Sequence, residues 1–433
     1  MRITGTKVVV LALLAILAAP FIAVASGAEE GGSDQPVEIR FHGRVGSQGD
    51  HFDRMRDIFN EMHGPAVTVK TEHFPGPEYA TKINTLIAGG TLGDAFWTAS
   101  IEGFNSYAAS GVYEPLEELV ATESFDLAAY FPSTVEALTF DGNLYGLPWG
   151  VHPGWYGLYY NKAMFDEAGV DYPTAEWTYE DLLEAAKQIA RPDEGIYGYA
   201  TPLNYWGFEA ATRAFGGDPL SADGTTVTLG EPDARAALQF LVDAIFTHRI
   251  TPSPEDIVGG INPMIAAGQI AMATGGFWVG SGLTNLMESR DAWGVVPHPY
   301  GLGSNPARGQ QIHVDVLGIN SASEHKNAAF RFIALACSED GAFDLWKNTG
   351  FPSARHDVIR RDEVKGDAHF QVFATGLGES WAAHQPANHR TQEVMRTIAS
   401  GLQGVWVGES SLDETLPDVV RKAQEVVDRP PAS

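Results

Sequence analysis

The chain has 433 residues, of which 55 are acidic and 28 are Lys or Arg, and a formal net charge of −27 at pH 7. Such an acidic balance disfavours nucleic acids and anionic membranes as partners, since both attract basic proteins. A single cysteine, Cys337, excludes an intramolecular disulfide, so stability depends on hydrophobic cores. A chain of this length exceeds what one core usually serves, which predicts two domains.

Residues 1–28 have the pattern of a secretory signal peptide. A basic start precedes an apolar run over 8–24 and small residues at Ala25 and Ala28, after either of which we expect cleavage. No cysteine closely follows the run, so we expect no lipid anchor, and no later segment is apolar over the roughly eighteen residues that span a membrane. The sequence therefore predicts an exported protein that diffuses freely in a Gram-negative periplasm.

The segment after residue 36 alternates between strand and helix patterns. The patterns predict a strand at 37–41 that ends at Gly43, a helix at 52–62, a strand at 67–69, a helix at 83–88 and a strand at 94–97. This order predicts an α/β fold with a largely parallel sheet. Ligands of such sheets bind at the carboxyl ends of strands, which makes candidates of His42, Arg44, Trp97 and Thr98.

Five aromatic rings and a histidine lie within Trp149–Tyr160. Such a stretch is what a site that stacks on a flat ring or sugar face would need, but composition alone favours plain core packing. A helix follows, with Thr178 as the expected N-cap and an apolar stripe over 182–189.

A second α/β unit follows in the sequence. The patterns predict a helix at 238–245 and a buried strand at 271–273 that ends in Gly275, Gly276, Phe277 and Trp278. Cys337 shares a helical face with Phe330 and Ile333, so we interpret it as buried core filler rather than a reactive thiol.

The segments LPWG, YYNKAMFDEAGV and EWTYEDLLEAAKQI occur in this order from residue 147. Together they resemble the signature region of the extracellular solute-binding protein family 1, the maltose-binding-like receptors of ABC importers. Further segments agree with the family in order and spacing: 94–119, 215–243, 265–278, 292–301 and 316–341. The resemblance covers essentially the whole mature chain.

The resemblance implies a type II-like periplasmic binding protein fold, with two α/β lobes and a ligand cleft between them. It places the first lobe at 36–148 plus 298–352 and the second at 149–297 plus 353–433. The aromatic stretch then lies on the crossover between lobes, where Trp149, His152 and Trp155 become candidates for ligand contact. The turn before YYNK is longer than the usual family pattern.

The resemblance also implies individual site residues. Trp206 and Trp278 align with aromatic positions that contact sugars in the family, and Asn204, Tyr205 and Phe277 adjoin them. Trp381 lies in a region that often supplies one more ring. Each of these rings has the alternative role of closing a lobe core.

Two charged residues widen the range of ligands. Asp315, in the segment QQIHVDVLGI with His313, and Arg44 can each hold sugar hydroxyls in bidentate fashion, and Arg44 can also pair with a carboxylate or phosphate. A solvated loop charge is the alternative for Arg44, and a cap or turn role is the alternative for Asp315. An anionic sugar derivative, such as a uronate or a glycerol phosphate ester, therefore stays open beside a neutral sugar or polyol.

Catalytic and metal motifs are sparse. The sequence contains no HExxH, G-x-S-x-G or P-loop pattern, and 218–224 lacks the ligand spacing of a calcium loop. Paired carboxylates such as Asp94 and Asp315 could act as a glycosidase dyad, so an exported glycan-processing enzyme is the lower alternative. We predict no catalytic residue, no metal and no cofactor.

The sequence thus predicts a monomeric periplasmic receptor for a carbohydrate. It would capture the ligand by lobe closure and deliver it to the permease subunits of an ABC transporter in the inner membrane. The identity of the sugar is not encoded in any pattern that we recognise.

Overall fold

A computed structural model of the chain describes residues 36–99, 103–287, 289–309, 313–378, 388 and 390–430. Pro36–Ser433 cluster as one compact unit, and the description concerns that unit. The predicted signal peptide and Trp381 lie outside the described residues.

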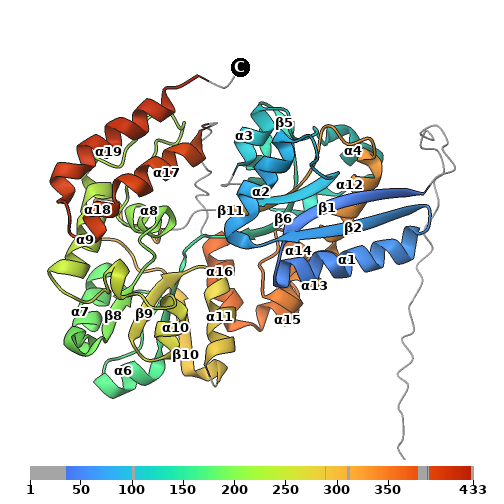
Figure 1. The fold of residues 1–433 in the computed structure, drawn as a ribbon. Helices are drawn as coiled ribbons and strands as arrows, with labels where there is room; N and C mark the ends of the chain where they lie inside the picture. Colours follow the sequence, from blue (N-terminus) through green and yellow to red (C-terminus); the bar gives the residue numbers. More distant parts are fainter. Residues whose placement is uncertain are drawn as a thin grey trace, which may run out of the picture. The chain divides into compact units, whose positions relative to one another are not determined.

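A five-stranded sheet organises the first part of the described chain (Figure 1). Its strands lie in the order β2 (Val67–Phe74), β1 (Val37–Arg44), β3 (Ala95–Ala99), β11 (His313–Ile319) and β6 (Leu147–His152). β1 pairs in parallel with β2 and β3, whereas β11 runs antiparallel to both β3 and β6. Helices α1 (Ser47–His63) and α12 (Lys326–Ala336) pack against each other and against this sheet.

A four-stranded sheet organises the second part. Its order is β10 (Trp293–Pro297), β7 (Gly157–Asn161), β9 (Ile270–Gly275) and β8 (Tyr197–Ala200). β7 runs antiparallel to both of its neighbours, and β8 is parallel to β9. Helices α7 (Tyr179–Ile189), α10 (Ile261–Ala266) and α16 (Ala368–Gly378) pack on its strands.

A group of helices beside the second sheet has a core of its own. Figure 1 shows α17 and α19, in red, next to α8 and α9, in green and yellow-green. The members are α8 (Tyr205–Ala214), α9 (Pro232–Phe246), α17 (Thr391–Gly401), α18 (Gln403–Trp406) and α19 (Leu412–Val427).

The remaining helices and the short hairpin complete the described elements. In chain order they are α2 (Gly76–Ala88), α3 (Phe104–Ala109), α4 (Glu117–Thr122), α5 (Pro132–Glu136), β4 (Thr139–Phe140), β5 (Asn143–Leu144), α6 (Lys162–Ala168), α11 (Trp278–Leu286), α13 (Glu339–Thr349), α14 (His356–Ile359) and α15 (Asp362–Lys365). None of the helices in the described ranges is both long and apolar enough to cross a lipid bilayer.

The predicted α/β class and the mostly parallel sheets are confirmed, since in each sheet all described strands but one run in the same direction. Both sheets are mixed, because the chain returns to the first sheet through β11 and enters the second through β7 in the opposite sense to their neighbours. Apolar periodicity reports which residues form a strand and not the direction in which the strand pairs.

The aromatic stretch connects the two sheets. β6 ends at His152 in the first sheet and β7 begins at Gly157 in the second, so residues 153–156 form one of the passages between them. The chain returns to the first sheet between β10 and β11.

Two local predictions are confirmed. Thr178 caps α7 in a reciprocal capping box with Asp181. Cys337 is buried at the end of α12, and burial raises the pKa of its thiol, which disfavours the reactive thiolate.

Replacing Thr178 with Ala tests whether this cap stabilises the second sheet. The Thr178 hydroxyl accepts a hydrogen bond from the Asp181 amide at 3.2 Å, and the Asp181 carboxylate accepts one from the Thr178 amide at 2.8 Å. We expect T178A to lower the free energy of unfolding by about 1 kcal/mol in urea titrations. T174A, in an exposed turn, is the control, and equal midpoints for the two variants would contradict the prediction.

Candidate functional site

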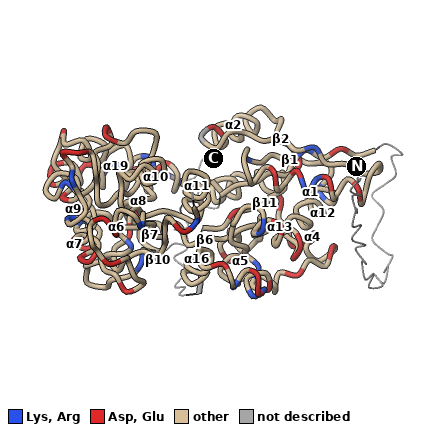
Figure 2. The backbone as a smooth tube through the Cα atoms, turned by 90° about the horizontal axis from the view of Figure 1, so that it is seen from below, with Lys and Arg blue, Asp and Glu red and all other residues tan. Residues whose placement is uncertain are grey.

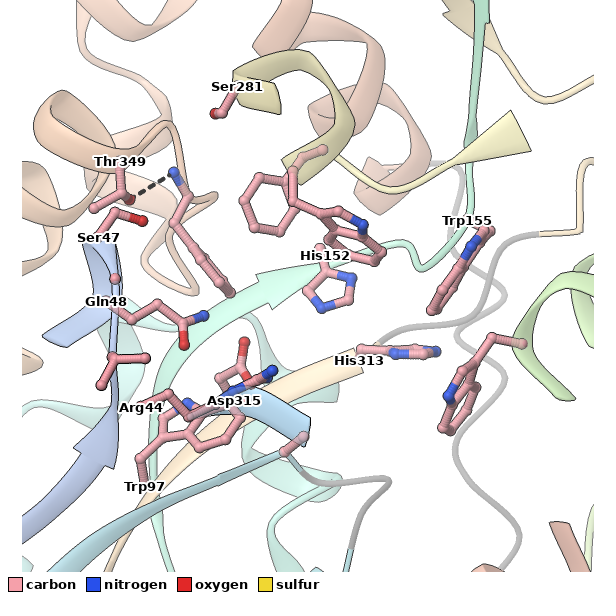
Figure 3. A pocket seen from close by; sticks show the side chains of 18 residues that line it. Arg44, Ser47, Gln48, Trp97, His152, Trp155, Ser281, His313, Asp315 and Thr349 are labelled. Atoms are coloured by element: carbon pink, nitrogen blue, oxygen red, sulfur yellow. Dashed lines mark hydrogen bonds between the residues drawn. The ribbon is translucent and has the colours of Figure 1, made fainter. Parts of the chain in front are cut away.

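A cavity of about 650 Å³ lies where the first sheet, the passage after β6 and helices α8 and α11 meet (Figure 3). We call it the aromatic cavity. Its lining residues are Arg44, Val45, Gly46, Ser47, Gln48, Gly76, Trp97, Ala99, His152, Trp155, Trp206, Phe277, Trp278, Ser281, His313, Asp315, Thr349 and Phe351. Aromatic rings beside a few polar groups are typical of small-molecule sites.

Three indole rings from three elements converge on the aromatic cavity. Trp155 follows β6, Trp206 lies in the first turn of α8, and Trp278 begins α11. The Trp155 and Trp206 rings are nearly parallel, with an interplanar angle of 9° and centroids 5.9 Å apart. Trp278 meets Trp155 edge to face at 4.9 Å. The rings thus present flat faces in two orientations.

Glycine makes this arrangement of rings possible at one position. A Cβ atom on Gly276 would lie 2.1 Å from the Trp278 ring, a distance that no real side chain tolerates. The Gly275-Gly276 pair that ends β9 therefore lets the Trp278 indole fold back over the backbone. Trp278 keeps 37% of its surface exposed, although it packs against Trp155, Phe277 and His152.

Strands of the first sheet supply the charged part of the cavity. In Figure 3, Arg44, Trp97 and Asp315 lie toward one end, and Trp155 and His313 toward the other. The Arg44 guanidinium lies 5.2 Å from the centroid of the Trp97 ring, within cation–π range. A Cβ on Gly76 would lie 2.4 Å from Arg44 Nη2, so the glycine leaves room for the guanidinium. Asp315 is buried, at 4% exposure.

His152 and His313 lie opposite each other on paired strands, with ring centroids 5.0 Å apart and an interplanar angle of 45°. Burial lowers the pKa of His152 to about 3. Burial, together with the neighbouring His152 and Arg213, lowers the pKa of His313 well below its ordinary value. Both imidazoles are therefore neutral near pH 7 and can donate and accept hydrogen bonds. Arg44 and Asp315 are then the charged groups among the described lining residues.

A second cavity, of about 580 Å³, adjoins the first and shares Arg44, Gly76 and Trp206 with it. We call it the arginine cavity. Its other lining residues come from α2, from the start of α8 and from α17: Ala80, Thr81, Asn84, Asn204, Tyr205, Gln392, Met395, Arg396 and Ala399.

The structure brings most of the predicted site residues to these cavities. Arg44, Trp97, His152, Trp155, Trp206, Phe277, Trp278 and Asp315 line the aromatic cavity, and Asn204 and Tyr205 line the arginine cavity. Whether these side chains contact a ligand stays a prediction.

Three predicted residues lie outside the lining of both cavities. His42 is fully buried and its Nε2 accepts a hydrogen bond from the Gly93 amide at 2.8 Å, so it serves the sheet core, where burial lowers its pKa to about 4. Thr98 alternates with Trp97 and Ala99 along β3 and therefore faces the opposite side of the sheet.

Trp149 is the third of these residues. Its indole N–H donates to His51 Nε2 at 3.2 Å, and its ring stacks on Phe52 of α1 with centroids 4.8 Å apart. The ring is 1% exposed, so it belongs to the core beneath β6, which was the alternative that the sequence left open.

Several lining residues were not predicted. Ser47 and Gln48 begin α1, which only two residues separate from the end of β1, so the strand-end argument that selected Arg44 could have included them. Thr349 and Phe351 come from the distant end of α13, where the Phe351 amide donates to Thr349 Oγ1 at 3.0 Å (Figure 3). Nothing in the local sequence marks those two residues or Ser281.

Two α/β parts with an aromatic cavity at their junction define the class of two-lobed binding proteins. The model of the bacterial extracellular solute-binding protein family matches residues 54–372. The chain therefore belongs to that family, as its sequence predicted, and the family consists of exported proteins that bind solutes rather than of enzymes.

Relatives and solved structures agree with this assignment. A binding protein of Brucella abortus (strain 2308) is 24% identical over 94% of this chain and 96% of its own length. The arabinooligosaccharide-binding protein of Halalkalibacterium halodurans is 29% identical over 54% of this chain and 52% of its own length.

Among solved structures, an ABC substrate-binding protein of Listeria monocytogenes in complex with cycloalternan superposes with a TM-score of 0.78 at 24% identity. The superposition covers 91% of this chain and 98% of the Listeria chain. UgpB of Mycobacterium tuberculosis, in complex with glycerophosphocholine, superposes with a TM-score of 0.78 at 20% identity. The superposition covers 92% of this chain and 99% of UgpB. These similarities show the fold.

Neutral burial of His152 predicts a loss of stability in acid. Its pKa in the folded state, about 3, lies below its ordinary value of 6.5, so the unfolded chain binds a proton that the folded chain does not. The stabilisation is complete above pH 6.5 and is lost as the pH falls toward 3. We expect the free energy of unfolding to fall less steeply in H152N than in the wild type, by about 1.4 kcal/mol per pH unit between roughly pH 6 and 4.

Urea titrations at a series of pH values measure this difference, with pH 7.5 as the baseline for any loss of packing. Parallel profiles for the two proteins would contradict the prediction.

Proposed function

We propose that this protein is a receptor that captures a carbohydrate in the aromatic cavity and delivers it to an ABC transporter permease. The observation that carries the proposal is the convergence of Trp155, Trp206 and Trp278 beside Arg44 and Asp315. Sugars present apolar C–H faces to such rings and hydroxyls to charged planar groups. Membership of the solute-binding family and the sugar ligand named for the Halalkalibacterium relative support the proposal.

The electrostatic balance of the aromatic cavity suits the neutral ring of a sugar. One cationic and one anionic side chain line it, and both histidines are neutral. His152 Nδ1 accepts from the Gly154 amide at 3.2 Å, which leaves its ring N–H as a donor, while Gln48 and Ser281 supply both donors and acceptors for hydroxyl groups. A buried polar group that remains unpaired is costly, so such a site discriminates strongly among hydroxyl arrangements.

We further propose that each sheet belongs to one lobe and that the lobes close on the ligand, with the passages after β6 and β10 as hinges. Lobe limits of 36–148 plus 298–352 and 149–297 plus 353–433 fit this division approximately, with β6 wholly in the first sheet. The mature receptor would be a periplasmic monomer without a lipid anchor, cleaved after Ala25 or Ala28.

Loss of single indole rings tests the site. We expect W155A, W206A and W278A each to weaken sugar binding about tenfold or more, because each removes a ring face that a sugar would cover. A thermal-shift screen of neutral oligosaccharides and polyols first identifies a ligand through the rise in melting temperature, and calorimetric titration then gives the affinities.

Y172A is the matched control, since Tyr172 is an exposed ring away from both cavities. Unchanged affinity in all three Trp variants would show that the ligand binds elsewhere. A screen in which no carbohydrate raises the melting temperature would contradict the receptor function itself.

Asp94 and Asp315, the carboxylate pair of the glycan-processing alternative, do not line a common cavity. Asp94 accepts hydrogen bonds from the Arg40 amide at 2.8 Å and from the Ser323 hydroxyl at 2.7 Å, and it lines neither cavity. Asp315 is then the one carboxylate among the described lining residues, whereas glycoside hydrolysis ordinarily requires two. We therefore propose that the protein performs no covalent chemistry.

Prolonged incubation with the bound oligosaccharide tests whether the protein performs any covalent chemistry. Chromatography is expected to recover the sugar intact after many hours, at a protein concentration that saturates binding. Products that appear with the wild type and disappear with D315N would establish an enzyme instead.

A further inference from the structure

The arginine cavity differs in charge from the rest of the molecule. Acidic residues are spread along much of the described chain (Figure 2), which has 55 acidic and 28 basic residues in all. Yet the described residues that line this cavity include Arg44 and Arg396 and no carboxylate. The described lining of this cavity therefore carries a local excess of positive charge.

Two neighbouring carboxylates do not line the cavity. Glu393, three residues before Arg396 on α17, pairs with Arg390 at 3.2 Å and with Arg429. Glu78 of α2 is exposed and is not among the residues that line the cavity, although it lies one turn before the lining residue Thr81.

Neither arginine of the cavity has an ion-pair partner in the described part of the chain. Most other arginines there, such as Arg54 and Arg355, pair with a carboxylate. Arg44 contacts the Trp97 ring, and Arg396 donates to Gln392 Oε1 at 3.0 Å. A guanidinium carries five N–H donors in a planar fork that matches carboxylate and phosphate oxygens, so most of this capacity is available to a ligand.

Three amide side chains of the cavity present donors as well. Asn84 Oδ1 accepts from the Tyr107 hydroxyl at 2.9 Å, Asn204 Oδ1 accepts from the Gly207 amide at 3.2 Å, and Gln392 Oε1 accepts from Arg396. Each amide oxygen thus already accepts one of the two hydrogen bonds that it can take, and each NH₂ group adds two donors for a ligand. A neutral sugar needs donors and acceptors together, whereas a carboxylate or phosphate group is an acceptor.

The two cavities adjoin, and Arg44, Gly76 and Trp206 line both. A sugar ring in the aromatic cavity can therefore extend a substituent along Arg44 toward Arg396. The net charge of the protein opposes the approach of anions, but charges beyond about 8 Å are screened at physiological salt, so the two nearby guanidinium groups dominate at the site.

On the basis of the proposed carbohydrate function, we propose that the arginine cavity binds an anionic group, a carboxylate or a phosphate, carried by a saccharide whose ring occupies the aromatic cavity. Arg396 contacts this group, and Arg44 bridges it to the sugar ring. The physiological cargo is then an acidic saccharide.

Matched pairs of probes test the proposal by calorimetric titration: digalacturonate against galactobiose, and trehalose 6-phosphate against trehalose. We expect the acidic member of at least one pair to bind at least tenfold more tightly at low salt, and the preferred pair to distinguish carboxylate from phosphate. We expect R396Q to reduce the affinity for the acidic member about tenfold and to change that for the neutral member less than twofold.

R360Q is the control, because Arg360 is exposed at the end of α14, outside both cavities, and lacks an ion-pair partner among the described residues. Neutral members that bind as tightly as acidic ones, with no effect of R396Q, would overturn this inference and leave the receptor function intact. Binding of inorganic phosphate alone, with no saccharide bound, would contradict the receptor function, and absence of all binding would overturn both.

Discussion

The register of β11 is the constraint on which the site depends. β11 lies between β3 and β6, with Asp315 opposite Ala99 on one side and Gly150 on the other, and His313 opposite His152. Side chains two residues apart share a face of a strand, so His313 and Asp315 point into the aromatic cavity with Trp97 and His152. A slip by one residue would turn all of β11's polar groups into the core behind the sheet.

This register explains which sequence predictions succeeded. Arg44 is the last residue of β1, where strand-end reasoning placed it, whereas Trp97 lies in the middle of β3, which runs two residues further than predicted. His42 lies two residues deeper in β1, or about 6–7 Å along the strand, and is enclosed. Trp149 lies on the opposite face of β6 from His152, against Phe52. Alternation along a strand was visible in the sequence, but which face would be open was not, because that depends on where α1 packs.

The lining residues from α13 and α17 could not be predicted from the sequence, because their position depends on how these helices pack. Thr349 and Phe351 reach the aromatic cavity through the packing of α13, and Gln392 and Arg396 reach the arginine cavity through α17. These helices are distant in sequence from every strand that forms the site. Helical periodicity identifies the buried faces of these helices but does not show which of their exposed residues line a cavity. The mostly parallel sheets were predicted, but the one opposed strand of each, β11 and β7, was not, because strand direction follows from connections and not from composition.

The two cavities are built from different kinds of residue, and this separates the stacking of a sugar ring from the preference for a charged group. The aromatic cavity is built from strand ends and from residues fixed by close approach, such as Gly276 beneath Trp278, so a substitution there disturbs the fold as well as the site. The arginine cavity includes, beside residues of β1 and α8, exposed side chains of α17 such as Arg396, which tolerate change at little cost in stability. A receptor of this fold can therefore keep the stacking surface for a sugar ring while the charge preferred at the neighbouring position changes through one or two helix residues.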